Sequence, residues 1–115
     1  MVNIDCNGIT VTQGDTLSVP VMPYIDETHT DVYSLAEGER FRFCVREVAG
    51  GEPVIEDFIN AQAEDGSFTI ALTTEQTAQL RREAYVFDLA LVNADGTEQE
   101  TFYGGEEEKK MLKVV

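Results

Sequence analysis

The sequence has few basic residues, one histidine, two cysteines and no tryptophan. Its 115 residues contain 8 Lys and Arg against 22 Asp and Glu, a formal net charge of −14. So acidic a chain has little with which to displace counterions from phosphates, which argues against nucleic acid as a partner. The same charge argues against anionic membrane surfaces. No apolar run approaches the ~20 residues of a membrane-spanning helix.

The single histidine, His29, limits the reactions that the chain can catalyse. A catalytic histidine needs a nucleophile or an orienting carboxylate beside it, and Thr28, Thr30 and Asp31 are candidates but also ordinary loop residues. A solvated loop histidine is the simpler interpretation. Neither a CxxC motif nor a Cys/His zinc spacing is present. We therefore expect no catalytic residue, no metal and no cofactor.

The segment from Ser67 to Leu91 carries the clearest information about the fold. Its two ends show the period-2 alternation of strands with one buried face. The alternating apolar residues are Phe68, Ile70 and Leu72, then Tyr85, Phe87, Leu89 and Leu91. Between the two ends, Thr73 and Gln76 have the spacing of a capping box, which predicts a short helix over residues 74–80.

A helical connection followed by a strand that opens with a tyrosine is typical of immunoglobulin-like sandwiches. In such folds the tyrosine hydroxyl hydrogen-bonds back to the backbone upstream, a tyrosine corner, and Tyr85 is our candidate for that structural role. Further strands are expected at residues 9–11, 16–21, 39–47, 54–59, 97–103 and 111–115. The sequence thus predicts an all-β, immunoglobulin-like β-sandwich of seven to eight antiparallel strands, with one short helical turn between two core strands.

The chain is expected to form one β-sandwich domain, residues 1–115, with a single core between two sheets. The predicted core residues are Phe41, Phe43, Phe68, Ile70, Leu72, Tyr85, Phe87 and Leu89. Pro20 cannot donate a ladder hydrogen bond, so its amide side is expected to face a sheet edge or a bulge.

Cys6 and Cys44 are expected to be free thiols. An immunoglobulin disulfide places its second cysteine two residues after the corner tyrosine, and Phe87 occupies that position here. Cys44 shares a strand face with Arg42 and Arg46, and positive charges so placed can lower the pKa of a thiol. A small half-buried side chain is the simpler interpretation of Cys44.

Three arginines, Arg40, Arg42 and Arg46, point outward from the strand at residues 39–47. They form a candidate interaction face, because they can pair with carboxylates of another copy of the chain. Pairing with a neighbouring strand of the same chain is the simpler interpretation.

The acidic loops raise the question of calcium. Asp26, Glu27, Asp31, Asp65 and Asp95 all lie in expected loops, but no stretch has EF-hand spacing, so solvated turn residues are preferred.

Several segments together suggest a known family. They are Gly14–Leu17, the stretches 33–35 and 37–39, Phe41–Arg46, Phe68–Thr73, Glu75–Leu80, Tyr85–Leu89, Asp95–Gly96 and 101–105. In this order they resemble small β-sandwich tail proteins of bacteriophages and prophages, similar to the N-terminal domain of baseplate upper proteins. The chain departs from that pattern at Arg82–Glu83, where such sequences often have a Pro-Gly turn.

The resemblance implies a non-enzymatic structural or assembly protein of a phage tail, located in the virion and made in the bacterial cytoplasm. Its partners would be other tail or baseplate proteins or its own copies, through the arginine face or through edges at Pro20 and at residues 111–115. An extracellular adhesion or carbohydrate-binding sandwich is the alternative, disfavoured because neither a signal peptide nor tryptophan is present. A small hydrolase is a remote third interpretation.

Overall fold

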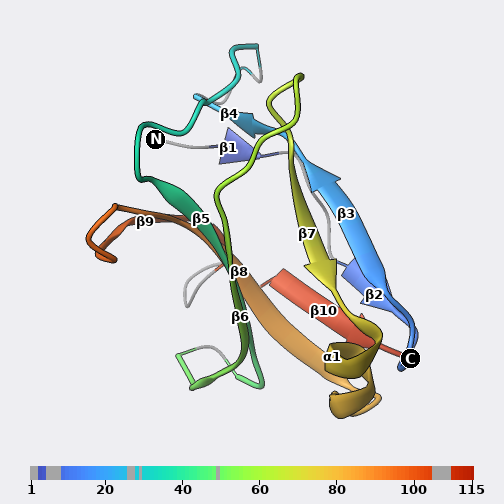
Figure 1. Ribbon diagram of the computed structural model, residues 1–115. Helices are drawn as coiled ribbons and strands as arrows, with labels where there is room; N and C mark the ends of the chain where they lie inside the picture. Colours follow the sequence, from blue (N-terminus) through green and yellow to red (C-terminus); the bar gives the residue numbers. More distant parts are fainter. Residues whose placement is uncertain (1–2, 5–8, 26–27, 29, 49, 105–109) are drawn as a thin grey trace.

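The computed structural model describes residues 3–4, 9–25, 28, 30–48, 50–104 and 110–115. These residues form ten strands and one short helix (Figure 1). The strands are β1 (Asn3–Ile4), β2 (Ile9–Val11), β3 (Leu17–Val21), β4 (Pro23–Tyr24), β5 (Arg40–Arg46), β6 (Pro53–Ile59), β7 (Phe68–Leu72), β8 (Ala84–Val92), β9 (Glu98–Gly104) and β10 (Lys110–Val114), and the helix is α1 (Thr74–Gln79). The all-β class predicted from the sequence is therefore confirmed.

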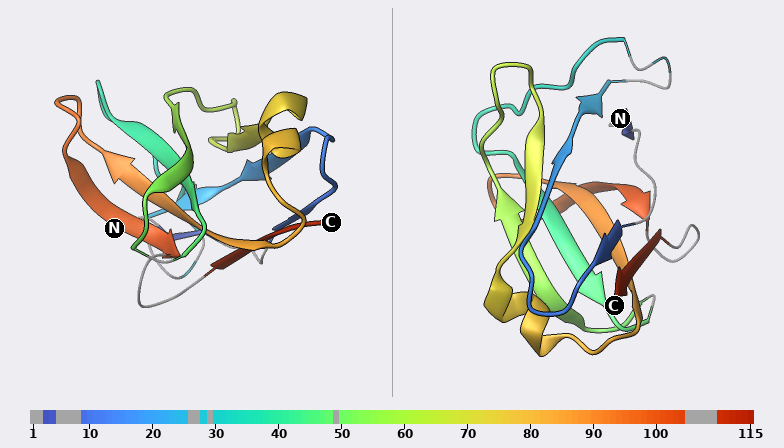
Figure 2. Two further views of the ribbon diagram at one scale, coloured as in Figure 1. Left: turned by 90° about the horizontal axis from the view of Figure 1, so that it is seen from below. Right: turned by 90° about the vertical axis from the view of Figure 1, so that its right-hand side faces the viewer.

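The largest sheet has the order β6–β5–β8–β10–β2, and β9 also pairs with β8. β5 pairs along one side of β8, whereas β10 and β9 divide its other side, at residues 84–87 and 88–92 respectively. β3 and β7 form a separate two-stranded sheet, and β1 pairs with β4. The two main sheets lie on opposite sides of the core, as the views in Figure 2 show.

Two expectations about the strands are wrong. β2 runs parallel to β10, so the sheet is mixed and not purely antiparallel. β10 lies between β2 and β8, so the C-terminal strand is not a sheet edge. Backbone hydrogen bonds extend the pairing of β2 with β10 beyond the two strands. The Val115 N–H donates to the backbone oxygen of Val11 at 2.9 Å, and the Gln13 N–H donates to the backbone oxygen of Val115 at 2.8 Å.

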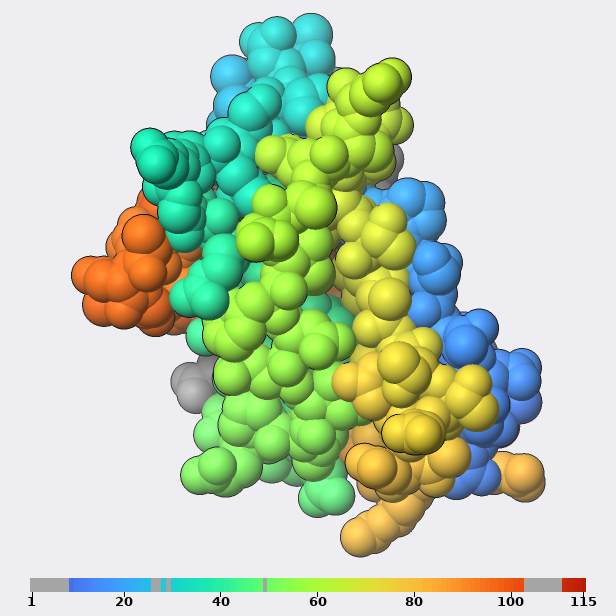
Figure 3. All heavy atoms as spheres, viewed as in Figure 1, coloured from blue at the N-terminus to red at the C-terminus, as the bar shows by residue number. Residues whose placement is uncertain are grey.

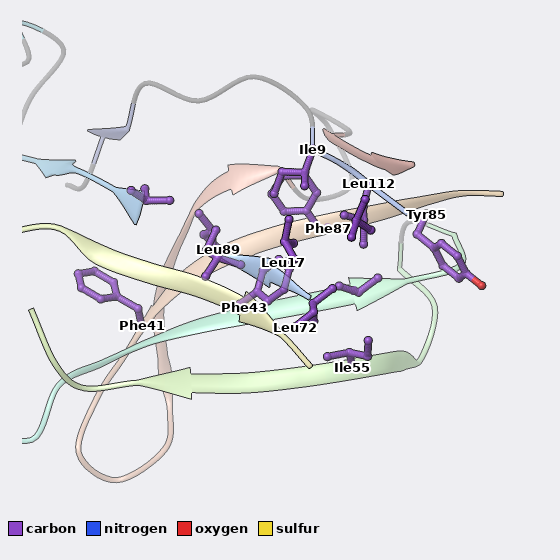
Figure 4. Close-up of a cluster of buried hydrophobic side chains, with 14 of the residues drawn as sticks. Ile9, Leu17, Phe41, Phe43, Ile55, Leu72, Tyr85, Phe87, Leu89 and Leu112 are labelled. Carbon is purple, nitrogen blue, oxygen red and sulfur yellow. The ribbon is translucent and has the colours of Figure 1, made fainter. Parts of the chain in front are cut away.

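The core lies between the β3–β7 pair and the large sheet (Figure 4). All eight predicted core residues are buried, which confirms the predicted strand faces. Phe41 of β5 stacks on Phe68 of β7 with ring centroids 4.0 Å apart, and Phe43 meets Phe87 edge to face at 5.8 Å. Aromatic pairs of this geometry add to the stabilisation that area burial provides.

The helix α1 connects β7 to β8 and begins with the predicted capping box. The Thr73 hydroxyl accepts a hydrogen bond from the Gln76 N–H, and the Gln76 side chain accepts one from the Thr73 N–H. On the buried side, the Thr77 hydroxyl donates to the Asp15 oxygen at 2.6 Å. The short helix is thus fixed both at its start and to the β2–β3 turn.

Several strands of the described residues have only one partner and so lie at sheet edges. β3 pairs only with β7 and β6 only with β5, and the same holds for β7, β2 and β9. Pro20 lies in β3, so the expected edge position of this strand is confirmed. In the part of the chain that the structure describes, no helix has the length and apolar character needed to cross a membrane.

The long connection before β5 is held by side chains from other segments. The Gln62 amide donates to the oxygens of Tyr33 and Gly66, at 2.9 and 2.7 Å, and accepts from the Leu35 N–H at 2.9 Å. Gly66 has φ +92°, and a Cβ added there would lie 2.4 Å from Cγ1 of Val32. Both the backbone angle and the close approach require glycine at this position.

Candidate functional site

The candidate interaction face lies on the side of the large sheet that points away from the core. Arg42, Cys44 and Arg46 of β5 stand in register with Ala90, Asp88 and Val86 of β8. Asp88 is only 6% exposed, although the alternation of its strand places it on this outer side. A buried carboxylate between two arginines defines a polar centre, which we call the Asp88 cluster: Arg42, Arg46, Asp88 and Glu98.

The arginines of this cluster are paired within the chain. Asp88 Oδ2 accepts from Arg46 Nη1, and Asp88 Oδ1 lies 3.5 Å from Arg42 Nη2. Arg42 Nη2 also donates to Glu98 Oε1 of β9 at 2.8 Å, and Arg46 Nε donates to the Gly51 oxygen at 2.8 Å. This is the cross-strand pairing that the sequence analysis treats as simpler. The two arginines therefore link β5, β8 and β9, and the carboxylates of Asp88 and Glu98 balance their charges.

The protonation of Arg42 reflects these neighbours. Burial by itself disfavours its charged form, but the negative charges of Glu98 and Asp88 outweigh that effect and raise the pKa of Arg42 above its ordinary value. Arg42 Nε is buried and has no hydrogen-bond partner. The cluster is thus an ionic site with one donor left unsatisfied.

Arg40 differs from the other two arginines. Its guanidinium lies over the Phe58 ring of β6, 4.6 Å from the ring centroid. Phe58 is 46% exposed, so this cation–π pair lies at the surface. Arg42 is the register partner of Phe58, whereas Arg40 lies over its ring.

Cys44 is a free thiol, as predicted, but it is fully buried. Its Sγ lies 4.0 Å from Glu56 Oε2. Burial raises the pKa of the Cys44 thiol, and the nearby charges of Arg46 and Arg42 do not offset this. The arginines therefore do not lower the pKa of Cys44, because the cost of burying a thiolate exceeds the attraction of arginines already paired with Asp88, and Cys44 is a structural side chain more deeply buried than the half-buried one expected. Cys6 lies outside the described residues.

Tyr85 is 2% exposed and its hydroxyl accepts a hydrogen bond from the Arg81 N–H at 2.9 Å. Arg81 lies in the connection between α1 and β8, which is where the sequence analysis expects the partner of this hydroxyl. The Gln13 side chain donates to the Leu80 oxygen at 2.7 Å in the same connection. Together these bonds fix the chain where it enters β8.

Two of the loop carboxylates that raised the question of calcium, Asp65 and Asp95, stabilise turns. Asp65 accepts from the backbone and hydroxyl of Ser67, at 2.9 and 2.7 Å, and Asp95 accepts from those of Thr97, at 2.9 and 2.6 Å. These hydrogen bonds lower the pKa of both aspartates. Across the described ranges, no group of His, Cys, Asp and Glu is placed to hold a metal ion. Asp26, Glu27 and His29 lie outside the described residues.

Two carboxylates that organise the structure were not expected from the sequence. One is Asp88, whose only local signal is an acidic residue in mid-strand. The other is Glu39, which accepts from the Ala36 N–H at 2.6 Å, from the Tyr33 hydroxyl at 2.9 Å and from the Gln99 side chain of β9. Gln99 is 60 residues away in the sequence, so no local pattern indicates this bond.

These bonds shift the pKa values of both groups in the Tyr33–Glu39 pair. Burial raises the pKa of Tyr33 to about 12, helped by its hydrogen bond to Glu39 and by the charges of Glu39 and Glu100. For Glu39, burial acts to raise the pKa, but the hydrogen bonds from Ala36, Gln99 and Tyr33 together outweigh it and lower the pKa from 4.5. The carboxylate form of Glu39 therefore holds this connection to β9.

No protein-family model matches the chain, and no curated protein sequence matches it.

Proposed function

We propose that this chain is an immunoglobulin-like β-sandwich that serves as a non-enzymatic structural or assembly protein of a bacteriophage or prophage tail. It acts through protein–protein contacts, with other tail or baseplate proteins or with its own copies. The observation that carries the proposal is the fold. The two-stranded β3–β7 sheet faces the large sheet, and the Tyr85 hydroxyl is hydrogen-bonded to the connection that precedes β8.

Several details support the immunoglobulin-like assignment. In such sandwiches a helical or looped connection joins the sheets, and a tyrosine near the start of the next strand bonds upstream. The Tyr85 hydroxyl and the Arg81 N–H have that relation. The ten strands formed by the described residues include the two-residue strands β1 and β4, and the other eight are longer.

The tail assignment rests on the order of sequence motifs together with this fold. An assembly module needs a rigid scaffold and surfaces for neighbours. The Asp88 cluster and the aromatic core provide rigidity, because they link β5, β8 and β9 on one side and β5 and β7 on the other. The edges β3 and β6 provide the surfaces.

Deletion of the gene from the genome that encodes it tests the role in assembly. Particles induced from the deleted strain should lack tails or carry incomplete tail tips in negative-stain electron microscopy, and a plasmid copy should restore them. Particles with complete tails and unchanged infectivity would refute a structural role.

Self-association is a separate consequence that light scattering can measure. With a net charge of −14, copies repel one another, so any association of copies should increase as salt screens the charges. Association that decreases with salt would show that attraction between opposite charges drives it.

A further inference from the structure

The strand β6 presents an accessible backbone edge. It is seven residues long, pairs only with β5 among the described residues, and keeps a regular register from Ile55 to Ile59. Figure 3 shows this strand (green) along the front of the molecule, with no other described element over it. Alternate N–H and C=O groups of β6 therefore point outward, as they do on any sheet edge.

The side chains of this edge have the character of a binding surface. Val54 and Phe58 are each 46% exposed, and the Arg40 guanidinium covers one face of the Phe58 ring. Exposed aromatic and arginine side chains are enriched at protein–protein interfaces. On the opposite face of β6, Ile55 belongs to the core and the half-buried Ile59 packs against it.

Charge determines which strand this edge accepts. Glu56 and Asp57 lie at the centre of β6, and Glu56 is exposed on the same face as Phe58. An antiparallel pairing of β6 with a second copy would bring these carboxylates opposite each other, which destabilises a strand pair. Among the other edge strands of the described residues, β3 carries Pro20, which cannot donate a ladder hydrogen bond. β6 begins with Pro53 but has a backbone donor at every residue from Val54 to Ile59, while its charges oppose self-pairing.

We propose that β6 is the docking edge for a β-strand of another protein, one that places basic side chains beside Glu56 and Phe58 and apolar side chains beside Ile55 and Ile59. Main-chain hydrogen bonds would provide the affinity, and the alternating side chains the specificity. A lysine at that position pairs with Glu56 and lays its apolar stem on the Phe58 ring. This inference rests on the proposed role in protein–protein contact, and names the chemistry of the partner.

Two synthetic peptides test the proposal by NMR on the full chain: one alternates lysine with valine and the other alternates glutamate with valine. The lysine peptide should shift the amide resonances of β6 and protect from hydrogen exchange those β6 amides that do not bond to β5. The glutamate peptide should bind more weakly. No shifts with either peptide, shifts centred on another strand, or equal binding of both would overturn the proposal.

A pair of matched variants tests the charge argument. Glu56→Lys should weaken binding of the lysine peptide about tenfold and strengthen binding of the glutamate peptide. Glu83→Lys makes the same charge change at an exposed position before β8, and should alter either affinity by no more than about twofold. Equal effects of the two variants would show that net charge alone acts. The β6 amides could also become protected from hydrogen exchange when the concentration of the chain is raised without peptide. That result would show that a second copy occupies the edge, and it would also overturn the proposal.

This test is independent of the virion. Failure of peptide binding while gene deletion still removes tails would refute the docking edge alone, whereas peptide binding with normal tails in the deleted strain would refute the tail role alone.

Discussion

Replacing Asp88 by asparagine should destabilise the fold by about 2–3 kcal/mol. The substitution keeps the shape of the side chain and removes the charge that faces both Arg42 and Arg46. Removing one partner of a fully buried ion pair costs ~3–5 kcal/mol, whereas exposed pairs contribute ~0–1 kcal/mol. The arginine side chains are 18% and 19% exposed and keep second acceptors, Glu98 Oε1 and the Gly51 oxygen, so we expect a value between these limits.

Urea unfolding followed by circular dichroism measures this change, with the slope against denaturant expected to stay constant. Glu56→Gln is the matched control, because it removes a carboxylate on the same side of the sheet. The Glu56 carboxylate lies 4.0 Å from the Cys44 sulfur. The control should change the free energy of unfolding by less than about 0.5 kcal/mol. If Asp88→Asn lowers the free energy of unfolding as little as the control does, the Asp88 cluster does not stabilise the link between β5, β8 and β9.

Three further predictions concern the connections. Tyr85→Phe should cost about 1 kcal/mol in urea unfolding, because it leaves the Arg81 N–H without its acceptor, and no change would refute the bond. Gly66→Ala should destabilise more than Gly96→Ala, since both have positive φ but only Gly66 meets Val32, and equal losses would refute the close approach. The lowered pKa of Glu39 means that its carboxylate stabilises the fold above pH 4.5, and that this contribution disappears as pH falls through the folded-state pKa. Glu39→Gln should remove that part of the dependence of the unfolding free energy on acid pH. An unchanged profile of unfolding free energy against pH would contradict this prediction.

The longer strands and the helix were predictable because their signals are local, whereas the two-residue strands β1 and β4 were not expected. The alternation in β5, β7 and β8 determines which side chains face the core, and the capping box at Thr73 determines where α1 begins. The parallel pairing of β2 with β10 was not predictable, because it joins segments from opposite ends of the chain. A period-2 pattern gives the face of each strand but not its neighbour in the sheet.

The candidate site shows the same limit. The outward direction of Arg42 and Arg46 follows from alternation, whereas the burial of Asp88 between them depends on the register of β5 with β8. Cys44 illustrates the consequence for chemistry. Its arginine neighbours were visible in the sequence, but its complete burial and the carboxylates of Asp88 and Glu56 become evident only in the assembled sheet.

Quantitative mass spectrometry of purified particles tests the central claim most directly. Phage particles induced from the strain that encodes the chain should contain it in a fixed ratio to tail proteins, and the ratio should persist through density-gradient purification and high-salt washing. A chain that is absent from such particles, or that washes away while the tail proteins remain, would contradict its assignment as a structural component of the tail.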